Sequence, residues 1–455
     1  MLVSKALAHD LIGSRTRLAV GAAALVILLA GCGGGGSGDT TPANPPPNIF
    51  HVIDHNGVSV SGVSVYVDGN PVPIGTTDAT GSIPRNLTGV HTVDFYKAGY
   101  IVTSRVNRDW TAVTGTVNIG MGPYPDVATT GTVDGLISNT INGDAIGVRS
   151  RRSSDGSTRF LSFPLATGSP TAYSLTSAPG GAGTSDLFVI PGNISFPAGS
   201  SFIGYNAGVA VPSTVNPSVV RGTATSFSVT ASGGFPPTGS INVFYGALTN
   251  RFVVGSDLIL FNSASTSGAT LGATTVNVPP FNLVYPNASY RLNVNAFGVP
   301  SSFGTPTGAN FPSRYERRIF PTHADMVAAA ATPQNIVLTN DAMVVVSPVH
   351  NAVNVSVSPT FTWSKTGTPD FVEIRLYEYD AARAFYAKFI WYAQVYGSTT
   401  SVTPPAALIT LSANTSYLYE LHARRNLTNS AGAFAGWQQN GWDDVKFSTG
   451  PTTPP

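Results

Sequence analysis

Val63-Ser64-Val65-Tyr66-Val67 places a valine at every second position, and the turn-forming segment Asp68-Gly69-Asn70 follows at once. Alternation with a period of two is typical of a β-strand that is buried on one face, and Asp, Gly and Asn are residues that tight turns use. Outward from this stretch, short strand-like segments recur between Gly-, Pro- and Ser-rich turns along most of the chain. The recurrence predicts an all-β protein.

The composition supports the same fold class. The chain has 455 residues, of which 10% are charged, with 48 Gly and 34 Pro. Soluble proteins usually carry roughly 25% charged residues, so the polarity here comes from hydroxyl and amide side chains, which suit strands and turns. One short helix is expected at Met326–Ala331, with Asp325 as its N-cap.

The charge balance argues against a nucleic-acid partner. The formal net charge is +1, and without the basic residues of the first 31 positions the chain is close to neutral. Nucleic-acid binding relies on a concentration of Lys and Arg, and anionic lipid headgroups are held by polybasic patches. The sequence shows neither, so any attachment to a membrane is expected to be covalent.

The N-terminus has the pattern of a secretory leader. Positive charges occupy residues 1–17, and residues 18–30 are almost wholly apolar but shorter than the roughly 20 residues that span a bilayer. The run ends at Leu29-Ala30-Gly31-Cys32, which resembles the lipobox of bacterial lipoproteins. The resemblance implies that Cys32 carries a diacylglycerol, and Gly33 after it favours export to the outer membrane. A plain signal peptide or an uncleaved anchor is the alternative.

A flexible tether follows the cysteine. Residues 33–47, GGGGSGDTTPANPPP, are of low complexity, with a coil-forming Gly/Ser half and an extended Pro half. Cys32 is the single cysteine of the chain, so no internal disulfide is expected.

Residues 48–122 carry spaced motifs that resemble the carboxypeptidase regulatory-like (transthyretin-like) β-sandwich. The matching positions are Asp54, Gly57, Val60, Gly62, Val65, Thr77, Asp78, Gly81, Leu87, Gly89, Val93, Gly99 and Tyr100. The resemblance implies a structural or binding role without catalytic residues. Asp78 is expected to bond the backbone of its own turn rather than Ca²⁺, which needs six to eight oxygen ligands.

The middle of the chain predicts two further β-rich modules, at 123–220 and 221–340, because short strand candidates recur there between Gly, Pro and Ser turns. Two basic clusters stand out, Arg149-Ser150-Arg151-Arg152 and Arg314-Tyr315-Glu316-Arg317-Arg318. Solvated loops would explain both. A site for an anionic ligand is the alternative, since guanidinium groups bind carboxylates and phosphates in a bidentate manner.

Residues 345–450 resemble a fibronectin type III-like domain, on the segment Pro359–Trp363 and on the pattern of Leu411, Thr415 and Tyr417. The resemblance implies that Tyr417 forms a tyrosine corner. Strands are predicted at Phe371–Glu378, Phe389–Tyr396, Tyr417–Ala423 and Val445–Ser448.

Three tryptophans are candidates for stacking on a ligand. Trp437 and Trp442 lie in a stretch, 434–442, that reads as a loop rich in Gly and amides, and exposed rings beside amides suit a sugar. The alternative is that these rings close the end of a sandwich. Trp391 is also a candidate, although its strand-like surroundings equally suit the core.

No motif for catalysis is present. The sequence lacks a nucleophile elbow, a His-Glu-x-x-His motif and a phosphate-binding loop. His51 and His55 would lie about 13 Å apart on a strand, too far for a shared metal. Only four Glu are present, which leaves little for paired acid–base chemistry. Catalytic residues, metal and cofactor are therefore all expected to be absent.

The sequence as a whole predicts tandem β-sandwich modules behind a lipoprotein signal peptide (1–31) and a lipidated linker (32–47). The favoured function is a non-enzymatic surface lipoprotein of the outer membrane that binds, adheres or acts as a spacer. Its expected partners are the membrane, through lipid on Cys32, and a glycan or another surface protein. A carbohydrate-binding lipoprotein and an uncharacterised enzyme in the middle region are the alternatives.

Overall fold

The structure, a computed structural model, describes residues 48–54, 57–124, 130–144, 146–152, 158–163, 166–179, 184–191, 202–221, 225–233, 239–248, 258–268, 273–278, 289–298, 311–338, 342–380, 385–428 and 434–455. In these ranges the regular elements are strands, apart from the helix α2 (His323–Ala330). The all-β fold class is confirmed. Cys32, the lipobox residues Leu29, Ala30 and Gly31, and the tether lie outside the described residues.

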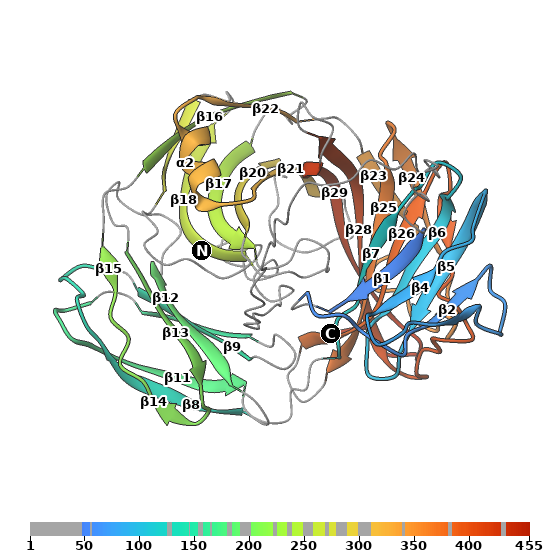
Figure 1. Ribbon diagram of the computed structural model, residues 1–455, viewed down its shortest axis with the longest axis horizontal. Coiled ribbons are helices and arrows are strands. Elements are labelled where there is room, and N and C mark those ends of the chain that lie inside the picture. The colour runs from blue at the N-terminus through green and yellow to red at the C-terminus, as the bar shows by residue number, and fades with distance from the viewer. Residues whose placement is uncertain are drawn as a thin grey trace, which may run out of the picture.

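One large sheet organises the molecule. It has 12 strands, and in Figure 1 it can be followed from β18 and β17 to β5 and β2. Its strands, in spatial order, are β18 (Leu258–Gly268), β17 (Gly239–Leu248), β20 (Ser289–Gly298), β21 (Phe311–Phe320), β29 (Phe434–Ser448), β28 (Ser416–Thr428), β25 (Phe371–Asp380), β26 (Phe385–Tyr396), β6 (Val102–Asp109), β5 (Val90–Tyr96), β2 (Ser64–Val67) and β3 (Gly75–Thr76).

The first unit pairs one end of the large sheet with a small sheet. The small sheet has three strands, β4 (Ser82–Pro84), β1 (Ile49–Ile53) and β7 (Thr116–Gly120). Between them lies a core in which Phe50 meets the rings of Phe95 and Trp110 edge to face, at 5.1 and 5.2 Å. The alternation of β2 fits this packing, because Val63 and Val65 are buried in the same core.

A tight turn at Thr77–Gly81 holds this unit together. Thr77 Oγ1 donates to the carbonyl of Val60 at 2.8 Å, and Asp78 Oδ1 accepts from the backbone N–H groups of Thr80 and Ser82. Gly81 has a φ of 72°, and a Cβ there would lie 2.7 Å from the carbonyl oxygen of Val52. The expectation that Asp78 bonds its own turn is confirmed.

The C-terminal unit packs a second small sheet on the opposite face of the large one. This sheet contains β23 (Ala342–Ser347), β24 (Phe361–Thr366) and β27 (Ser401–Val402), and its core includes Phe361, Trp363 and Val102 of β6. On β5, in contrast, Phe95 faces the core of the first unit and is the register partner of Thr103. Since Val102 and Thr103 are neighbours on one strand, they lie on opposite faces, and so do the two small sheets.

The middle of the chain contributes three more sheets. One core unites a five-stranded sheet with a three-stranded one, and a further three-stranded sheet accompanies α2. The strands are β10 (Thr158–Phe163), β9 (Ile146–Arg152), β12 (Ser185–Pro191), β13 (Phe202–Val209) and β15 (Val220–Arg221); β11 (Thr171–Pro179), β8 (Thr130–Ile137) and β14 (Ser213–Thr214); and β19 (Ala273–Val278), β16 (Thr225–Gly233) and β22 (Gln334–Leu338).

The helix α2 begins earlier than predicted. Its N-cap is Thr322, not Asp325, because Thr322 Oγ1 accepts from the Asp325 backbone N–H at 3.1 Å while Asp325 Oδ2 accepts from the Thr322 backbone N–H at 3.0 Å. This reciprocal capping box satisfies two N–H groups at the start of the helix. Met326 is buried, and α2 contacts β16 of the small sheet as well as β20 and β21 of the large one.

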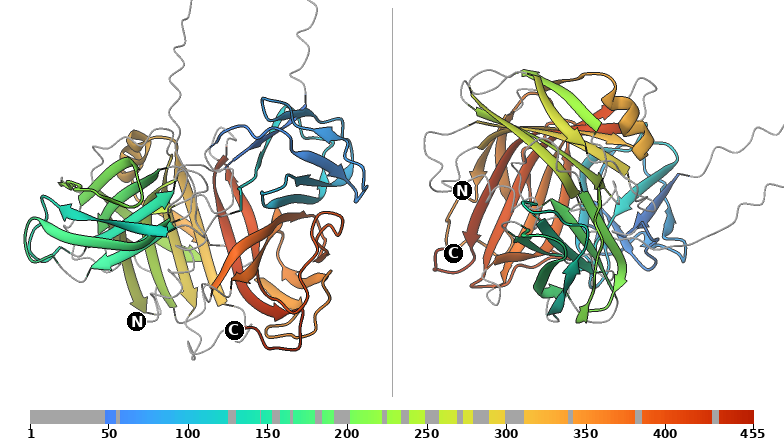
Figure 2. Two further views of the ribbon diagram at one scale, coloured as in Figure 1. Left: turned by 90° about the horizontal axis from the view of Figure 1, so that it is seen from below. Right: turned by 90° about the vertical axis from the view of Figure 1, so that its left-hand side faces the viewer.

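Strand pairing joins the units directly. β6 of the first unit runs parallel to β26 of the C-terminal unit, and β21 from the middle of the chain pairs antiparallel with β29. Figure 2 shows the result, with the N-terminal unit in blue lying beside the C-terminal unit in orange and red. The units are therefore connected through backbone hydrogen bonds as well as through linkers.

Candidate functional site

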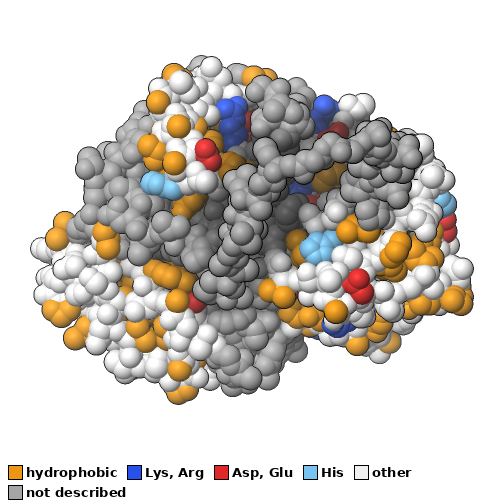
Figure 3. Space-filling view, viewed as in Figure 1, with side chains coloured by type: hydrophobic (Ala, Val, Ile, Leu, Met, Phe, Trp, Pro, Cys, Tyr) orange, Lys and Arg blue, Asp and Glu red, His pale blue; other side chains and the backbone are white. Residues whose placement is uncertain are grey.

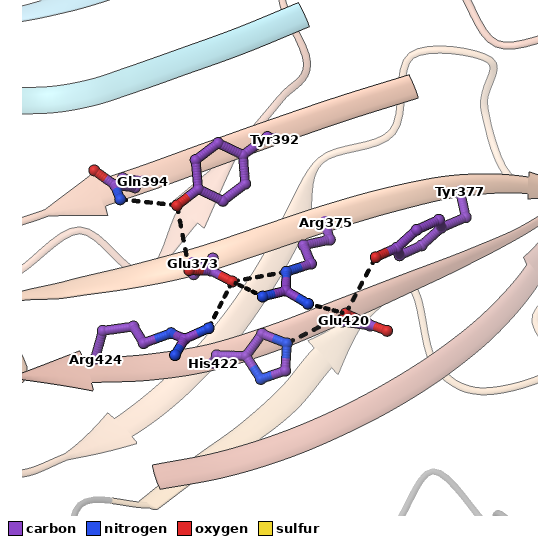
Figure 4. A network of polar contacts seen from close by, with 8 residues as sticks. All are labelled: Glu373, Arg375, Tyr377, Tyr392, Gln394, Glu420, His422 and Arg424. Carbon is purple, nitrogen blue, oxygen red and sulfur yellow. Dashed lines mark hydrogen bonds and ion pairs between the residues drawn. The ribbon is translucent and has the colours of Figure 1, made fainter. Parts of the chain in front are cut away.

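A buried polar network covers one face of β25, β26 and β28. On β25, Val372, Ile374 and Leu376 face the C-terminal core, so Glu373 and Arg375 lie on the other face. Buried carboxylates are rare unless they are paired, and this face holds both Glu373 and Glu420. In Figure 4 the side chains from the three strands converge on these carboxylates. We treat the network as the candidate functional site.

Glu373 is the centre of one half of the network. Its Oε1 accepts from Arg375 Nε at 2.7 Å and from Arg424 Nη2 at 2.9 Å, so two guanidinium groups share one carboxylate oxygen. Its Oε2 accepts from the Tyr392 hydroxyl at 3.2 Å, and that hydroxyl accepts in turn from Gln394 Nε2 at 2.8 Å. The carboxylate is thus satisfied from both of its neighbouring strands.

Glu420 is the centre of the other half. Its Oε2 lies 3.3 Å from Arg375 Nη1, so Arg375 bridges the two glutamates. The same oxygen accepts from the Tyr377 hydroxyl at 3.5 Å and lies 3.3 Å from His422 Nε2. Because an ionised carboxylate only accepts hydrogen bonds, His422 donates from Nε2.

The electrostatics fix the protonation of this network. Burial alone would raise the pKa of Glu373, but the charges of Arg375 and Arg424 outweigh it and hold that pKa well below its usual range. Burial lowers the pKa of His422 and outweighs the hydrogen bond that His422 donates to Glu420, which raises it. Burial and Glu420 raise the pKa of Tyr377. At neutral pH Glu373 is therefore an anion, and His422 and Tyr377 are neutral.

This arrangement acts as a clamp across three strands. Glu373 cannot serve as a general acid near neutral pH, because its folded-state pKa is too low and both of its oxygens are occupied. Arg105 on β6 extends the clamp, with its guanidinium 5.6 Å from the centre of the Tyr392 ring. The geometry is that of a structural network which fixes the strand order at the junction of two units.

A second polar chain crosses the same junction on the opposite face. Trp391 Nε1 donates to Ser104 Oγ at 2.9 Å, and Ser104 Oγ donates to Asp94 Oδ1 at 2.6 Å. The chain therefore runs from β26 through β6 to β5. Burial raises the pKa of Asp94 to about 6, although the hydrogen bond from Ser104 lowers it.

Trp391 is not available for stacking on a ligand. Its side chain is fully buried in the C-terminal core, where its ring lies 6.1 Å from that of Phe361, and its indole N–H is used by Ser104. The core interpretation of this strand residue accounts for these contacts, and the stacking hypothesis for Trp391 was wrong.

Trp437 and Trp442 do not lie in a loop. Both belong to the strand β29, where Trp437 is the register partner of Arg317 and Trp442 is that of Phe311. The Gly and amide content of this segment is typical of a loop, but the segment pairs with long strands on both sides, and this pairing overrides local propensity. The side chains of both tryptophans lie outside the described part of the structure.

The basic cluster at 314–318 also lies on a strand and not in a loop. β21 alternates its residues between the two faces, so Glu316 and Arg318 share one face while Tyr315 and Arg317 share the other. Arg318 Nε donates to Glu316 Oε1 at 2.8 Å, and its Nη1 donates to Gln334 Oε1 at 2.8 Å. Arg318 is therefore engaged within the protein.

The network itself was missed at the sequence level. The available signal was the spacing of charged residues two apart, Glu373 with Arg375 and Glu420 with His422 and Arg424, within strands that were correctly expected. The acidic side chains of one strand meet the basic side chains of the other only if β25 and β28 pair in this particular register. The sequence does not reveal that register.

In the ranges that the structure describes, no three His, Cys, Asp or Glu side chains lie together as metal ligands. No described helix is both long enough and apolar enough to cross a bilayer.

No family model matches the chain, and no curated protein matches it. Among solved structures it is similar to BcpA, the major pilin subunit of Bacillus cereus, at 10% identity and a TM-score of 0.13, over 65% of this chain and 98% of that one. It is also similar to a mutant of the shaft pilin SpaA of Lactobacillus rhamnosus GG, at 8% identity and a TM-score of 0.14, over 46% of this chain and 98% of that one. Such TM-scores do not establish a shared fold.

Proposed function

We propose that the protein is a non-enzymatic, lipid-anchored binding protein of the cell envelope that displays its β-sandwich units beyond the surface of an outer membrane. The observation that carries this proposal is the 12-stranded sheet, which passes through the N-terminal, middle and C-terminal parts of the chain. Separate sandwiches on linkers would reorient freely, whereas units that share a sheet present one rigid surface.

The leader supports the anchoring part of the proposal. A short apolar run ends at Leu29-Ala30-Gly31-Cys32, and a Gly- and Pro-rich tether separates that cysteine from the first strand, which begins at Ile49. Two or three acyl chains give stable membrane residence, at about 0.8 kcal/mol for each buried methylene. The tether would reach on the order of 20–40 Å and hold the folded part clear of the headgroups.

Two local geometries support the proposed module types. In the first unit, the bonds of Thr77 and Asp78 fit the turn of a carboxypeptidase regulatory-like sandwich. In the C-terminal unit, the Tyr417 hydroxyl accepts from the backbone N–H of Ser412 at 2.8 Å, which fits the tyrosine corner of a fibronectin type III-like domain. Both module types are consistent with binding without catalysis.

Membrane fractionation tests the anchor. We expect the unaltered protein to sediment with outer membranes and to partition into detergent, and Cys32→Ala to move it into the soluble fraction or to stop its maturation. Ser37→Ala in the tether is a matched control that keeps the wild-type distribution. Cys32→Ala protein that remains in the membrane fraction, with the leader removed, would overturn lipid anchoring.

A further inference from the structure

A serine, a histidine and an asparagine meet on the outer face of the small sheet in the first unit. Phe50 and Val52 of β1 face the core, so His51 between them lies on the outer face. The His51 Nδ1 atom lies 3.1 Å from Asn118 Oδ1, and its Nε2 atom lies 3.0 Å from Ser59 Oγ. The imidazole therefore bridges an amide and a hydroxyl. We call these three residues the Ser59 triad.

Backbone pairing places the three side chains of the triad. His51 is the register partner of Asn118 on the parallel neighbour β7. Ser59 lies beside β1 in an isolated antiparallel bridge. Asp54 helps to hold the connection between β1 and this bridge, because its Oδ1 accepts from the backbone N–H of Val58 at 2.9 Å. The triad is thus assembled by the strand order of the first unit.

The chemistry of the groups gives the direction of both hydrogen bonds. An amide oxygen only accepts, so His51 donates from Nδ1 to Asn118. In the neutral imidazole the other nitrogen is then an acceptor, so the Ser59 hydroxyl donates to His51 Nε2. A serine is activated as a nucleophile when its hydroxyl donates to a base that a third group orients. The Ser59 triad has this arrangement.

The serine of the triad is open to solvent. Ser59 is exposed, and His51 and Asn118 are half-buried. In Figure 3, histidine side chains lie on the described surface of the right-hand half of the molecule, where Figure 1 shows the N-terminal unit. A small molecule can therefore reach the Ser59 hydroxyl without a movement of the chain.

The backbone N–H of Ser59 is also placed to act on a ligand. On one side of Ser59, the N–H of Val60 donates to the carbonyl of Val52 at 2.9 Å. On the other side, the N–H of Asp54 donates to the carbonyl of Val58 at 2.8 Å. Ser59 therefore occupies the non-hydrogen-bonded position of its bridge, and its own N–H points away from β1. The N–H of a nucleophilic serine is one of the donors that stabilise the oxyanion formed in acyl transfer.

We propose that Ser59 is a modification site that takes an acyl group from carboxylic esters, with His51 as general base and Asn118 as the residue that positions His51. The Ser59 oxygen forms a bond to the carbonyl carbon of the ester while its proton passes to His51 Nε2. The bond from that carbon to the alcohol oxygen then breaks, and the alcohol leaves with the proton. The products are an acyl ester on Ser59 and a free alcohol. This inference goes beyond the proposed binding function and does not depend on it.

The third residue suits the site to a single acyl transfer rather than to rapid turnover. A carboxylate at this position would stabilise the imidazolium that forms on His51, whereas the amide of Asn118 carries no charge. In a serine protease, replacing the orienting Asp with Asn lowers turnover about 10⁴-fold. We therefore expect Ser59 to be acylated slowly and to lose its acyl group slowly.

The test exposes the purified full-length protein to p-nitrophenyl acetate, measures the rate of p-nitrophenolate release and locates acetyl groups by peptide mass spectrometry. We expect an acetyl group on Ser59. Ser59→Ala should abolish this modification, and His51→Gln should slow it about 100-fold, since a general base contributes about 10²–10⁴-fold. Asn118→Asp should speed it about tenfold or more, because the carboxylate supplies the missing charge. Asn118→Ala should slow it about tenfold through loss of orientation.

The same segments supply matched controls. Ser61 is an exposed serine two residues from Ser59, and Thr116 lies two residues before Asn118 on β7. Ser61→Ala and Thr116→Ala should leave the acetylation rate within about twofold of wild type. Circular dichroism and the thermal midpoint establish that each variant is folded.

Three outcomes would overturn the proposal. They are the absence of acetyl on Ser59 of the folded protein, a wild-type rate of acetylation in folded His51→Gln, and wild-type rates in the folded Asn118 variants. A triad that only links strands would move the thermal midpoint in these variants and leave the chemistry of Ser59 unchanged.

Discussion

Two polar chains cross the junction between the N-terminal and C-terminal units, and they treat a buried carboxylate in opposite ways. On one face of the sheet, Glu373 receives Arg375 and Arg424, and its pKa is held well below the usual range. On the other face, Asp94 receives only the hydroxyl of Ser104, and burial raises its pKa to about 6. Both carboxylates are less than 5% exposed.

The difference teaches that burial by itself does not set the charge of a carboxylate; its partners do. Two guanidinium groups offset the free-energy cost of desolvating the Glu373 carboxylate, whereas one neutral hydroxyl does not offset that cost for Asp94. The first chain should therefore stabilise the junction at neutral pH. The second should stabilise it more in mild acid. Four experiments, from the largest expected effect to the smallest, would break or sharpen this contrast.

Glu373→Gln removes the negative charge between Arg375 and Arg424 and leaves two guanidinium groups buried. We expect a loss of about 3–5 kcal/mol in the free energy of unfolding at pH 7, the usual cost of breaking a buried pair from one side. Urea denaturation followed by tryptophan fluorescence measures it.

The stability that Glu373→Gln loses relative to wild type should change with pH in the direction set by the lowered pKa of Glu373. The pKa of Glu373 is lowered in the folded state, so its stabilising effect is present above the unfolded value near 4.5 and is lost as the pH falls below it. The difference in the free energy of unfolding between wild type and Glu373→Gln should therefore become smaller only below pH 4.5. A variant as stable as wild type at pH 7 would contradict the clamp.

Asp94→Asn should have the opposite sign. The folded pKa of about 6 exceeds the unfolded value of 3.8, so the stability linked to Asp94 is fully present below pH 3.8 and is lost as the pH rises through 6. The Asn side chain does not ionise and so avoids the cost of a buried charge. We expect Asp94→Asn to raise the free energy of unfolding by up to about 3 kcal/mol at pH 7.5 and by little at pH 4. Thermal midpoints across pH 4–8 check it, and a variant less stable than wild type at every pH would refute it.

Ser104→Ala removes the donor to Asp94 and the acceptor of the Trp391 indole N–H. We expect a loss of about 1–3 kcal/mol, since buried polar groups are left unsatisfied. Because the hydrogen bond from Ser104 lowers the pKa of Asp94, its removal should shift the acid-linked change in stability to higher pH. An unchanged pH midpoint would show that Ser104 does not set this pKa.

Lys388→Ala should have the smallest effect. Lys388 Nζ lies 2.8 Å from Glu378 Oε1, but the lysine side chain is half exposed. Exposed ion pairs contribute about 0–1 kcal/mol, and this one should weaken further in high salt. A loss as large as that of Glu373→Gln would mean that burial is not what separates the two pairs. Urea titrations in low and high salt make the comparison.

The sequence predicted the local structure of this protein better than the pairing between its distant strands. The alternation at Val63–Val67 and the turn at Thr77–Gly81 are present as expected. The strand predicted at Phe371–Glu378 is also present and ends two residues later, at Asp380. Such features depend on neighbouring residues, and the alternation shows which of them can be buried together.

The candidate site could not be predicted because its residues come together through pairing between distant strands. Val445–Ser448 was expected as a short strand, yet β29 begins at Phe434, since β21 and β28 pair with its amide-rich first half. Glu373 meets Arg424 only because β25 and β28 adopt one particular register. Local composition carries no information about such a register.

The pairing of β6 with β26 also sets an order of events when the chain is made. Ser104 and Trp391, which hydrogen-bond across this boundary, are separated by 287 positions. A growing chain exposes β6 as an open strand edge until β26 (Phe385–Tyr396) has emerged, and open edges invite pairing with other molecules. Contacts so distant in sequence also form slowly. The junction that makes the finished protein rigid therefore makes its biogenesis depend on protection of that edge until β26 arrives.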